Sequence, residues 1–98
     1  MTESEIRDKI YEFLKKKGIM CWKDKQMIKQ GGRGFPKFQK GLPDLMGILS
    51  DGTFLGIEVK KPGGKVSPEQ IEFINQANEK GAMCFIAYDL EDVRKRFI

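Results

Sequence analysis

Residues 41–60 read GLPDLMGILSDGTFLGIEVK and contain two apolar runs separated by an Asp-Gly pair. Asp51-Gly52 is a strong signal for a two-residue β-hairpin turn, because both central residues of that turn adopt positive φ. The stretch therefore predicts a strand over 44–50, a tight turn, and a return strand over 53–60. In that register Glu58 stands opposite Leu45, beside Asp44.

The chain after the hairpin predicts a second helix. Ser67 and Gln70 have the spacing of a capping box, and Pro68 between them suits the first helical position. Gly81 is expected to end the helix. The residues expected to form its buried stripe are Ile71, Ile74 and either Ala77 or Asn78.

Two further elements complete the C-terminal half. Residues 82–87 are apolar without interruption, which is typical of a central strand buried on both faces. Residues 89–98 predict a short helix with Leu90, Val93 and Phe97 on one side.

The N-terminal part predicts a helix over 2–17, capped by Thr2 and Glu5 and ended by Gly18. Its apolar face consists of Ile6, Ile10, Phe13 and Leu14. A strand follows over 19–22. The resulting order is α-β-β-β-α-β plus a short C-terminal helix, which predicts one α/β domain over 1–98 with a mixed sheet flanked by helices.

Composition excludes several classes of site. The chain has 98 residues, 40% hydrophobic and 33% charged, and no apolar run approaches a membrane span. The start of the chain lacks a signal-peptide pattern, so we expect a cytoplasmic protein. Cys21 and Cys84 sit in apolar runs and are expected to be reduced core residues. Since the chain has no histidine, acid–base chemistry must use carboxylates, lysine or a metal-activated water.

The net charge of +4 is concentrated in one segment. Residues 23–42 are rich in glycine and show no periodicity, which predicts a long loop. Its basic side chains, the candidate DNA-binding residues, are Lys23, Lys25, Lys29, Arg33, Lys37 and Lys40. Only Asp24 opposes them before residue 41. A solvated loop is the simpler explanation, but glycine and aromatic residues among the lysines favour contact with a polyanion.

Asp44, Glu58 and Lys60 are the candidate chemical groups. Glu58 and Lys60 lie two residues apart on one strand, so both side chains point to the same face. Asp44 and Glu58 are expected to converge at one end of the hairpin, where the two carboxylates repel each other unless a cation neutralises them. Oxygen ligands suit Mg²⁺ or Mn²⁺, and a nearby ammonium can orient an attacking water. The alternative is that Glu58 and Lys60 form the solvent face of an edge strand.

These motifs carry a family resemblance. Gly-Leu-Pro-Asp-Leu at 41–45, Ile-Glu-Val-Lys at 57–60 and Ser-Pro-Glu-Gln at 67–70 resemble the PD-(D/E)xK nuclease superfamily. Within it, the chain is most similar to the stand-alone VRR-NUC domains carried by phages, which are similar in their core to archaeal Holliday-junction resolvases. The resemblance implies a restriction-endonuclease-like core and covers nearly the whole chain.

The resemblance also implies roles. Asp44 and Glu58 match the metal-binding carboxylates, with the backbone carbonyl of Val59 as a further ligand. Lys60 matches the catalytic lysine. Gln70 matches a glutamine near the site, although the capping box alone also accounts for it.

The family further places a glutamate on the first helix, and two residues compete for that position. Glu3 lies about 35° from the centre of the apolar face, whereas Glu5 lies more than about 100° away and has the cap role. Glu3 is therefore the candidate, with Glu5 as the alternative.

The function expected from the resemblance is Mg²⁺- or Mn²⁺-dependent endonucleolytic cleavage of branched DNA such as four-way junctions. A homodimer would suit the two-fold symmetry of that substrate, and the cytoplasm of a bacterial host would be its location if a phage encodes it. Two alternatives remain: a nicking, flap or restriction-like nuclease, and a non-catalytic DNA-binding module on the same fold.

Overall fold

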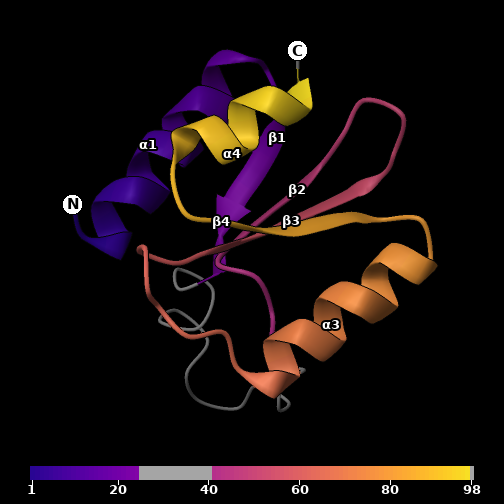
Figure 1. The fold of residues 1–98 in the computed structure, drawn as a ribbon. Coiled ribbons are helices and arrows are strands. Elements are labelled where there is room, and N and C mark those ends of the chain that lie inside the picture. The colour runs from indigo at the N-terminus through magenta and orange to yellow at the C-terminus, as the bar shows by residue number, and fades with distance from the viewer. Residues whose placement is uncertain (25–40, 98) are drawn as a thin grey trace, which may run out of the picture.

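The computed structural model of the chain describes residues 1–24 and 41–97 (Figure 1). Its elements in chain order are α1 (Glu3–Lys16), β1 (Met20–Lys23), β2 (Leu45–Ile48), β3 (Phe54–Val59), α3 (Pro68–Glu79), β4 (Met83–Ala87), α4 (Leu90–Arg94) and the 3-10 helix η1 (Lys95–Phe97). The predicted α/β fold class is confirmed. The basic loop, with Lys25, Lys29, Arg33, Lys37 and Lys40, lies outside the described residues.

The strands form one mixed sheet in the order β1-β2-β3-β4. β1 and β3 are both antiparallel to β2, and β4 runs parallel to β3. In Figure 1, α1 and α4 lie together on one side of the sheet and α3 lies on the other. None of the helices in the described part of the chain has the length and apolar character needed to cross a membrane.

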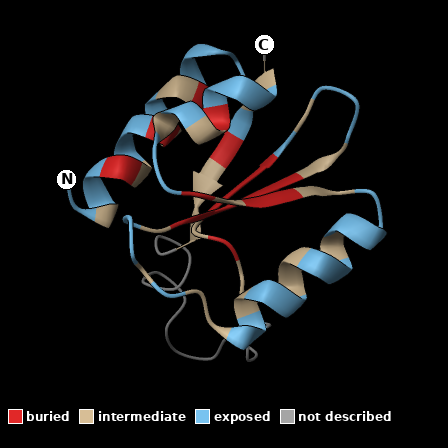
Figure 2. Cartoon of the chain, viewed as in Figure 1, coloured by how far each residue is buried: buried red, intermediate tan, exposed pale blue. Residues whose placement is uncertain are grey.

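The main core lies between the sheet and α1. Figure 2 shows buried residues along the strands and on the inner side of α1, whereas α3 has none. Ile10 and Leu14 are completely buried against the strands, and Val93 of α4 closes the same cluster. Cys21 and Cys84 are buried free cysteines, as predicted.

Leu14→Ala is expected to lower the free energy of unfolding by about 2–5 kcal/mol, because the truncation leaves a cavity in a close-packed core. Urea denaturation measures this loss. Glu12→Ala, an exposed change on the same helix, should stay within about 0.5 kcal/mol of wild type. Equal stabilities for the two variants would contradict the assignment of this core.

The hairpin turn is one residue longer than predicted. The Leu49 N–H donates to the Thr53 carbonyl at 2.9 Å, which leaves a loop of residues 50–52. Gly52 has a φ of 89°, and the Asp51 carboxylate accepts the Thr53 N–H at 2.9 Å. This is the three-residue turn in which a left-handed glycine follows a type I turn.

The longer turn moves the strand register by one position. Leu45 pairs with Ile57, so the residue opposite Glu58 is Asp44, and the prediction of Leu45 at that position was wrong. Because directly opposed residues point to the same face of a sheet, the correction draws the two carboxylates together.

One prediction about strand position and one about burial were also wrong. Within the described residues β4 pairs with β3 alone, so it is an edge strand and not a central one. Its outer backbone at Cys84 is instead satisfied by Asn78 of α3, whose side-chain amide exchanges hydrogen bonds of 2.8 and 2.9 Å with it. Ile71 is 46% exposed, because α3 directs the partly buried Phe73, Ile74 and Ala77 toward the sheet.

Candidate active site

Asp44 and Glu58 meet at the end of the hairpin away from the turn. Asp44 immediately precedes β2, and Pro43 before it is completely buried. The Asp44 Oδ2 accepts the backbone N–H of Val59 at 3.0 Å. This bond ties the first carboxylate to the residue that follows Glu58.

Glu58 is a buried charged residue with only 2% of its surface exposed. Its Oε2 accepts a hydrogen bond of 2.7 Å from the Gln70 side-chain amide and lies 3.4 Å from the Lys60 Nζ. Its Oε1 is buried and has no hydrogen-bond partner among the described residues. An unpartnered buried carboxylate oxygen costs free energy unless a ligand satisfies it.

The environment raises the pKa of Glu58 from 4.5 to about 7. Burial is the main cause, because it disfavours the charged form, and the negative charge of Asp44 adds to it. The Lys60 ammonium acts in the opposite direction. A carboxyl group that titrates near neutral pH beside a second carboxylate is typical of functional sites.

The raised pKa of Glu58 predicts a pH dependence of stability in the absence of metal. Between 4.5 and about 7 the unfolded chain has lost this proton while the folded chain keeps it. The free energy of unfolding should therefore fall as pH rises through that window and become level above it. Urea titrations in chelator should show a flatter profile for Glu58→Gln than for wild type. Parallel profiles would contradict the raised pKa.

Gln70 both caps α3 and contacts Glu58. Its Oε1 accepts the backbone N–H of Ser67 at 2.9 Å, which completes the capping box of α3. Its Nε2 donates to Glu58 from the same amide group. The cap fixes the side chain, so the amide holds Glu58 in one orientation.

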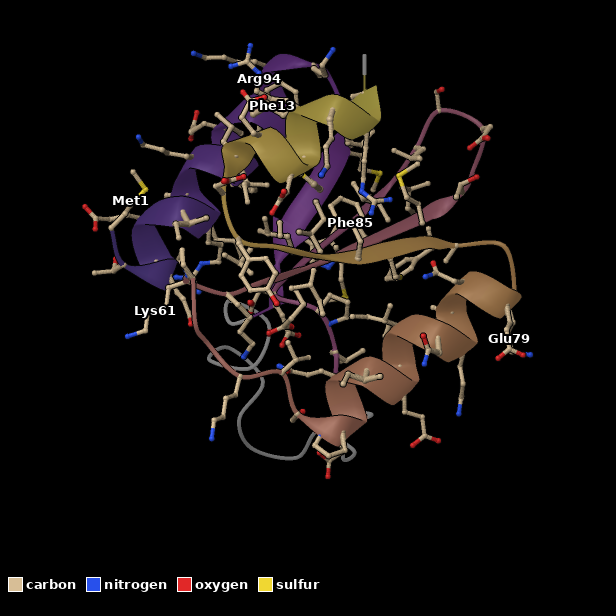
Figure 3. All side chains as sticks on the ribbon, viewed as in Figure 1. Met1, Phe13, Lys61, Glu79, Phe85 and Arg94 are labelled. Atoms are coloured by element: carbon tan, nitrogen blue, oxygen red, sulfur yellow. The ribbon has the colours of Figure 1, made fainter. Side chains whose placement is uncertain are left out.

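The two candidate glutamates of α1 have separate contacts. Glu5 Oε1 accepts the backbone N–H of Thr2 at 2.8 Å and belongs to the cap. Glu3 Oε2 accepts the backbone N–H of Lys61 at 3.2 Å. Figure 3 shows Lys61 beside the N-terminal end of α1, with its side chain directed away from the fold. The structure thus places Glu3, and not Glu5, against the backbone of Lys61, two residues past the end of β3.

Lys23, the described member of the basic set, makes intramolecular contacts. Its Nζ lies 2.9 Å from Asp8 Oδ1 and 4.9 Å from the centre of the Tyr11 ring. A DNA phosphate would have to compete with Asp8 for this ammonium.

Asp24 is a third carboxylate that the sequence reasoning missed. Its backbone N–H donates to the Asp44 carbonyl at 2.9 Å. The register of the sheet, extended by one residue, therefore places Asp24 just after β1 and Asp44 just before β2 in one row with Glu58 of β3. Burial, and then the charge of Asp44, raise the pKa of Asp24. The sequence did place Asp24 just after the strand predicted over 19–22. It did not show which strand pairs with that one, so the proximity of Asp24 to Asp44 could not be predicted.

Comparison with known proteins assigns the family. Residues 1–88 match the family model of the VRR-NUC domain. The chain belongs to the VRR-NUC family. Such domains are in general nucleases, so this VRR-NUC domain has a DNA-processing function of the nuclease type. None of the curated proteins compared with it matches.

Solved structures agree with the assignment at the level of the fold. One structure of a VRR_NUC domain has a TM-score of 0.72 and 22% identity, over 99% of this chain and 96% of the other. A VRR_NUC domain protein also has a TM-score of 0.72, with 21% identity over 99% of this chain and 85% of the other. At these identities the likeness describes the fold alone.

The site of this VRR-NUC domain fits a divalent cation of the hard type. In the described ranges no three Asp, Glu, Cys or His side chains gather closely enough to enclose a metal ion. Mg²⁺ does not require such a cage, since proteins often hold it through one or two carboxylates and leave its other positions to water and phosphate. Asp44 and the unpartnered Oε1 of Glu58 provide such a pair.

Proposed function

We propose that this domain is an endonuclease that hydrolyses DNA phosphodiester bonds with Mg²⁺ or Mn²⁺ as cofactor. The observation that carries the proposal is the buried Glu58 carboxylate, with one oxygen unpartnered, opposite Asp44 and beside the Lys60 ammonium. A DNA-binding module would have no use for this costly pair of carboxylates.

Asp44, Glu58 and the backbone carbonyl of Val59 would hold the cation. When bound, it supplies positive charge to the scissile phosphate and lowers the pKa of a nearby water. Lys60 orients that water and stabilises negative charge on the phosphate. Gln70 keeps Glu58 oriented, and Glu3 provides a further carboxylate at the end of β3.

The substrate that the charge distribution favours is DNA held through its backbone. The basic side chains of 23–40 provide contacts to phosphate, which position DNA without reading its sequence. A domain this small has little surface for base recognition, so we propose selection by DNA shape. Branched DNA such as a four-way junction, bound by a homodimer with two sites, is the proposed substrate. If a phage encodes the domain, we propose that it acts in the cytoplasm of a bacterial host.

A substrate panel tests the proposal. Matched linear, flap and four-way DNA are incubated with protein in Mn²⁺, with and without chelator. We expect cleavage only in the Mn²⁺ samples without chelator, and the fastest cleavage on the four-way substrate. Faster cleavage of flap or linear DNA would support the proposed nuclease activity but contradict the proposed preference for four-way DNA. Binding without cleavage of any DNA in Mg²⁺ or Mn²⁺ would support the non-catalytic module instead.

A further inference from the structure

Gly41 packs against the first turn of α3, far from it in sequence. It has a φ of 84°, in the left-handed region that favours glycine. A Cβ at this position would overlap the carbonyl oxygen of Glu69 and lie 2.9 Å from the backbone nitrogen of Gln70. Both are backbone atoms, so a side chain at Gly41 cannot be accommodated by a change of rotamer.

Residues 42 and 43, between Gly41 and Asp44, form a short link with a fixed conformation. Pro43 is buried, and its Cγ lies so close to Gly56 of β3 that a Cβ there would stand 2.8 Å away. Asp44 is held by the Val59 N–H. The link therefore touches β3 at Pro43 and Asp44 and touches α3 at Gly41.

Both ends of this link lead to Glu58, one through Asp44 and the other through the α3 turn that packs on Gly41. Asp44 stands opposite it on the sheet, and Gln70 donates to its Oε2 from α3. None of the α3 side chains is buried, so packing against the sheet holds this helix less firmly than α1. A displacement caused at Gly41 would thus be taken up by the N-terminal turn of α3, which carries Gln70.

We infer that Gly41 is a positioning residue, whose lack of a side chain sets the distance between the Asp44 segment and Gln70 and so holds Glu58 for metal binding. The expected effect of Gly41 on cleavage rests on the proposed function. The hydrogen bond between Gln70 and Glu58 can be measured whether or not the domain cleaves DNA.

The test compares Gly41→Ala with Gly52→Ala. Gly52 has a similar φ of 89°, but nothing lies within 4 Å of its Cβ position, so this control carries the backbone strain without the overlap. The first readout is the NMR signal of the Gln70 side-chain amide, assigned from its loss in Gln70→Ala. We expect the signal to shift in Gly41→Ala and to stay at the wild-type position in Gly52→Ala. A wild-type signal in both variants would overturn the inference.

The second readout is a double-mutant cycle on Mn²⁺ affinity and cleavage rate. Gly41→Ala and Gln70→Ala should each lower these by roughly 10- to 100-fold, as loss of a partner of a metal ligand does. If Gly41 acts through Gln70, the double variant should be no worse than Gln70→Ala. Multiplied losses would show a general defect and contradict the inference. A wild-type protein that neither binds Mn²⁺ nor cuts DNA would refute the proposed function, while the amide signal would still decide the role of Gly41.

Discussion

Asp44→Asn is expected to reduce Mn²⁺-dependent cleavage by at least about 1000-fold, equivalent to about 4 kcal/mol of transition-state stabilisation. The amide that replaces the carboxylate can still accept the Val59 N–H, so the fold should be retained, but it lacks the charge that a cation requires. Single-turnover cleavage of the preferred substrate measures the loss.

The matched control for this variant is Asp51→Asn. Asp51 lies on the same hairpin at the exposed turn, and its side chain caps the Thr53 N–H. It should cleave at the wild-type rate. Comparable losses in the two variants would mean that overall charge, and not a site at Asp44, controls the activity.

Lys60→Ala is expected to lower the cleavage rate roughly 100- to 1000-fold, the range for loss of one group that stabilises charge in the transition state. Mn²⁺ binding should persist, because the carboxylates remain and a competing positive charge beside Glu58 has been removed. The measurement pairs cleavage rates with calorimetric Mn²⁺ affinity.

Lys61→Ala is the control for Lys60→Ala, since it removes the same charge from the next residue. The Lys61 side chain is exposed, and its contact with Glu3 uses only the backbone N–H (Figure 3). It should keep nearly full activity. Loss of Mn²⁺ affinity in Lys60→Ala would contradict the assigned role and indicate a structural one.

Local patterns predicted most of the fold because they are properties of neighbouring residues. The capping boxes at Thr2 and Ser67 correctly marked the starts of α1 and α3. The turn length was not predictable from the Asp-Gly pair alone. It depends on the Asp51 side chain accepting the Thr53 N–H, which favours a type I turn over the two-residue turn.

Features that depend on contacts between distant segments were harder to predict. The apolar run of β4 suggested a central strand. An edge strand whose two faces are covered by helices has the same apolar sequence pattern as a central strand, so the pattern could not separate the two positions. Asp24 was missed because its proximity to Asp44 requires knowing that β1 pairs with β2. The capping box required only Oε1 of Gln70, and nothing in the sequence showed where Nε2 would point.

Calorimetric titration of Mn²⁺ near neutral pH tests most directly whether Asp44 and Glu58 form a metal site. Lys60→Ala protein is used with four-way DNA present, so that the substrate is consumed only slowly. We expect saturable uptake of Mn²⁺ that is lost when Asp44→Asn or Glu58→Gln is added to the same protein. No uptake with DNA present, or uptake unchanged by either substitution, would contradict a metal site built by Asp44 and Glu58.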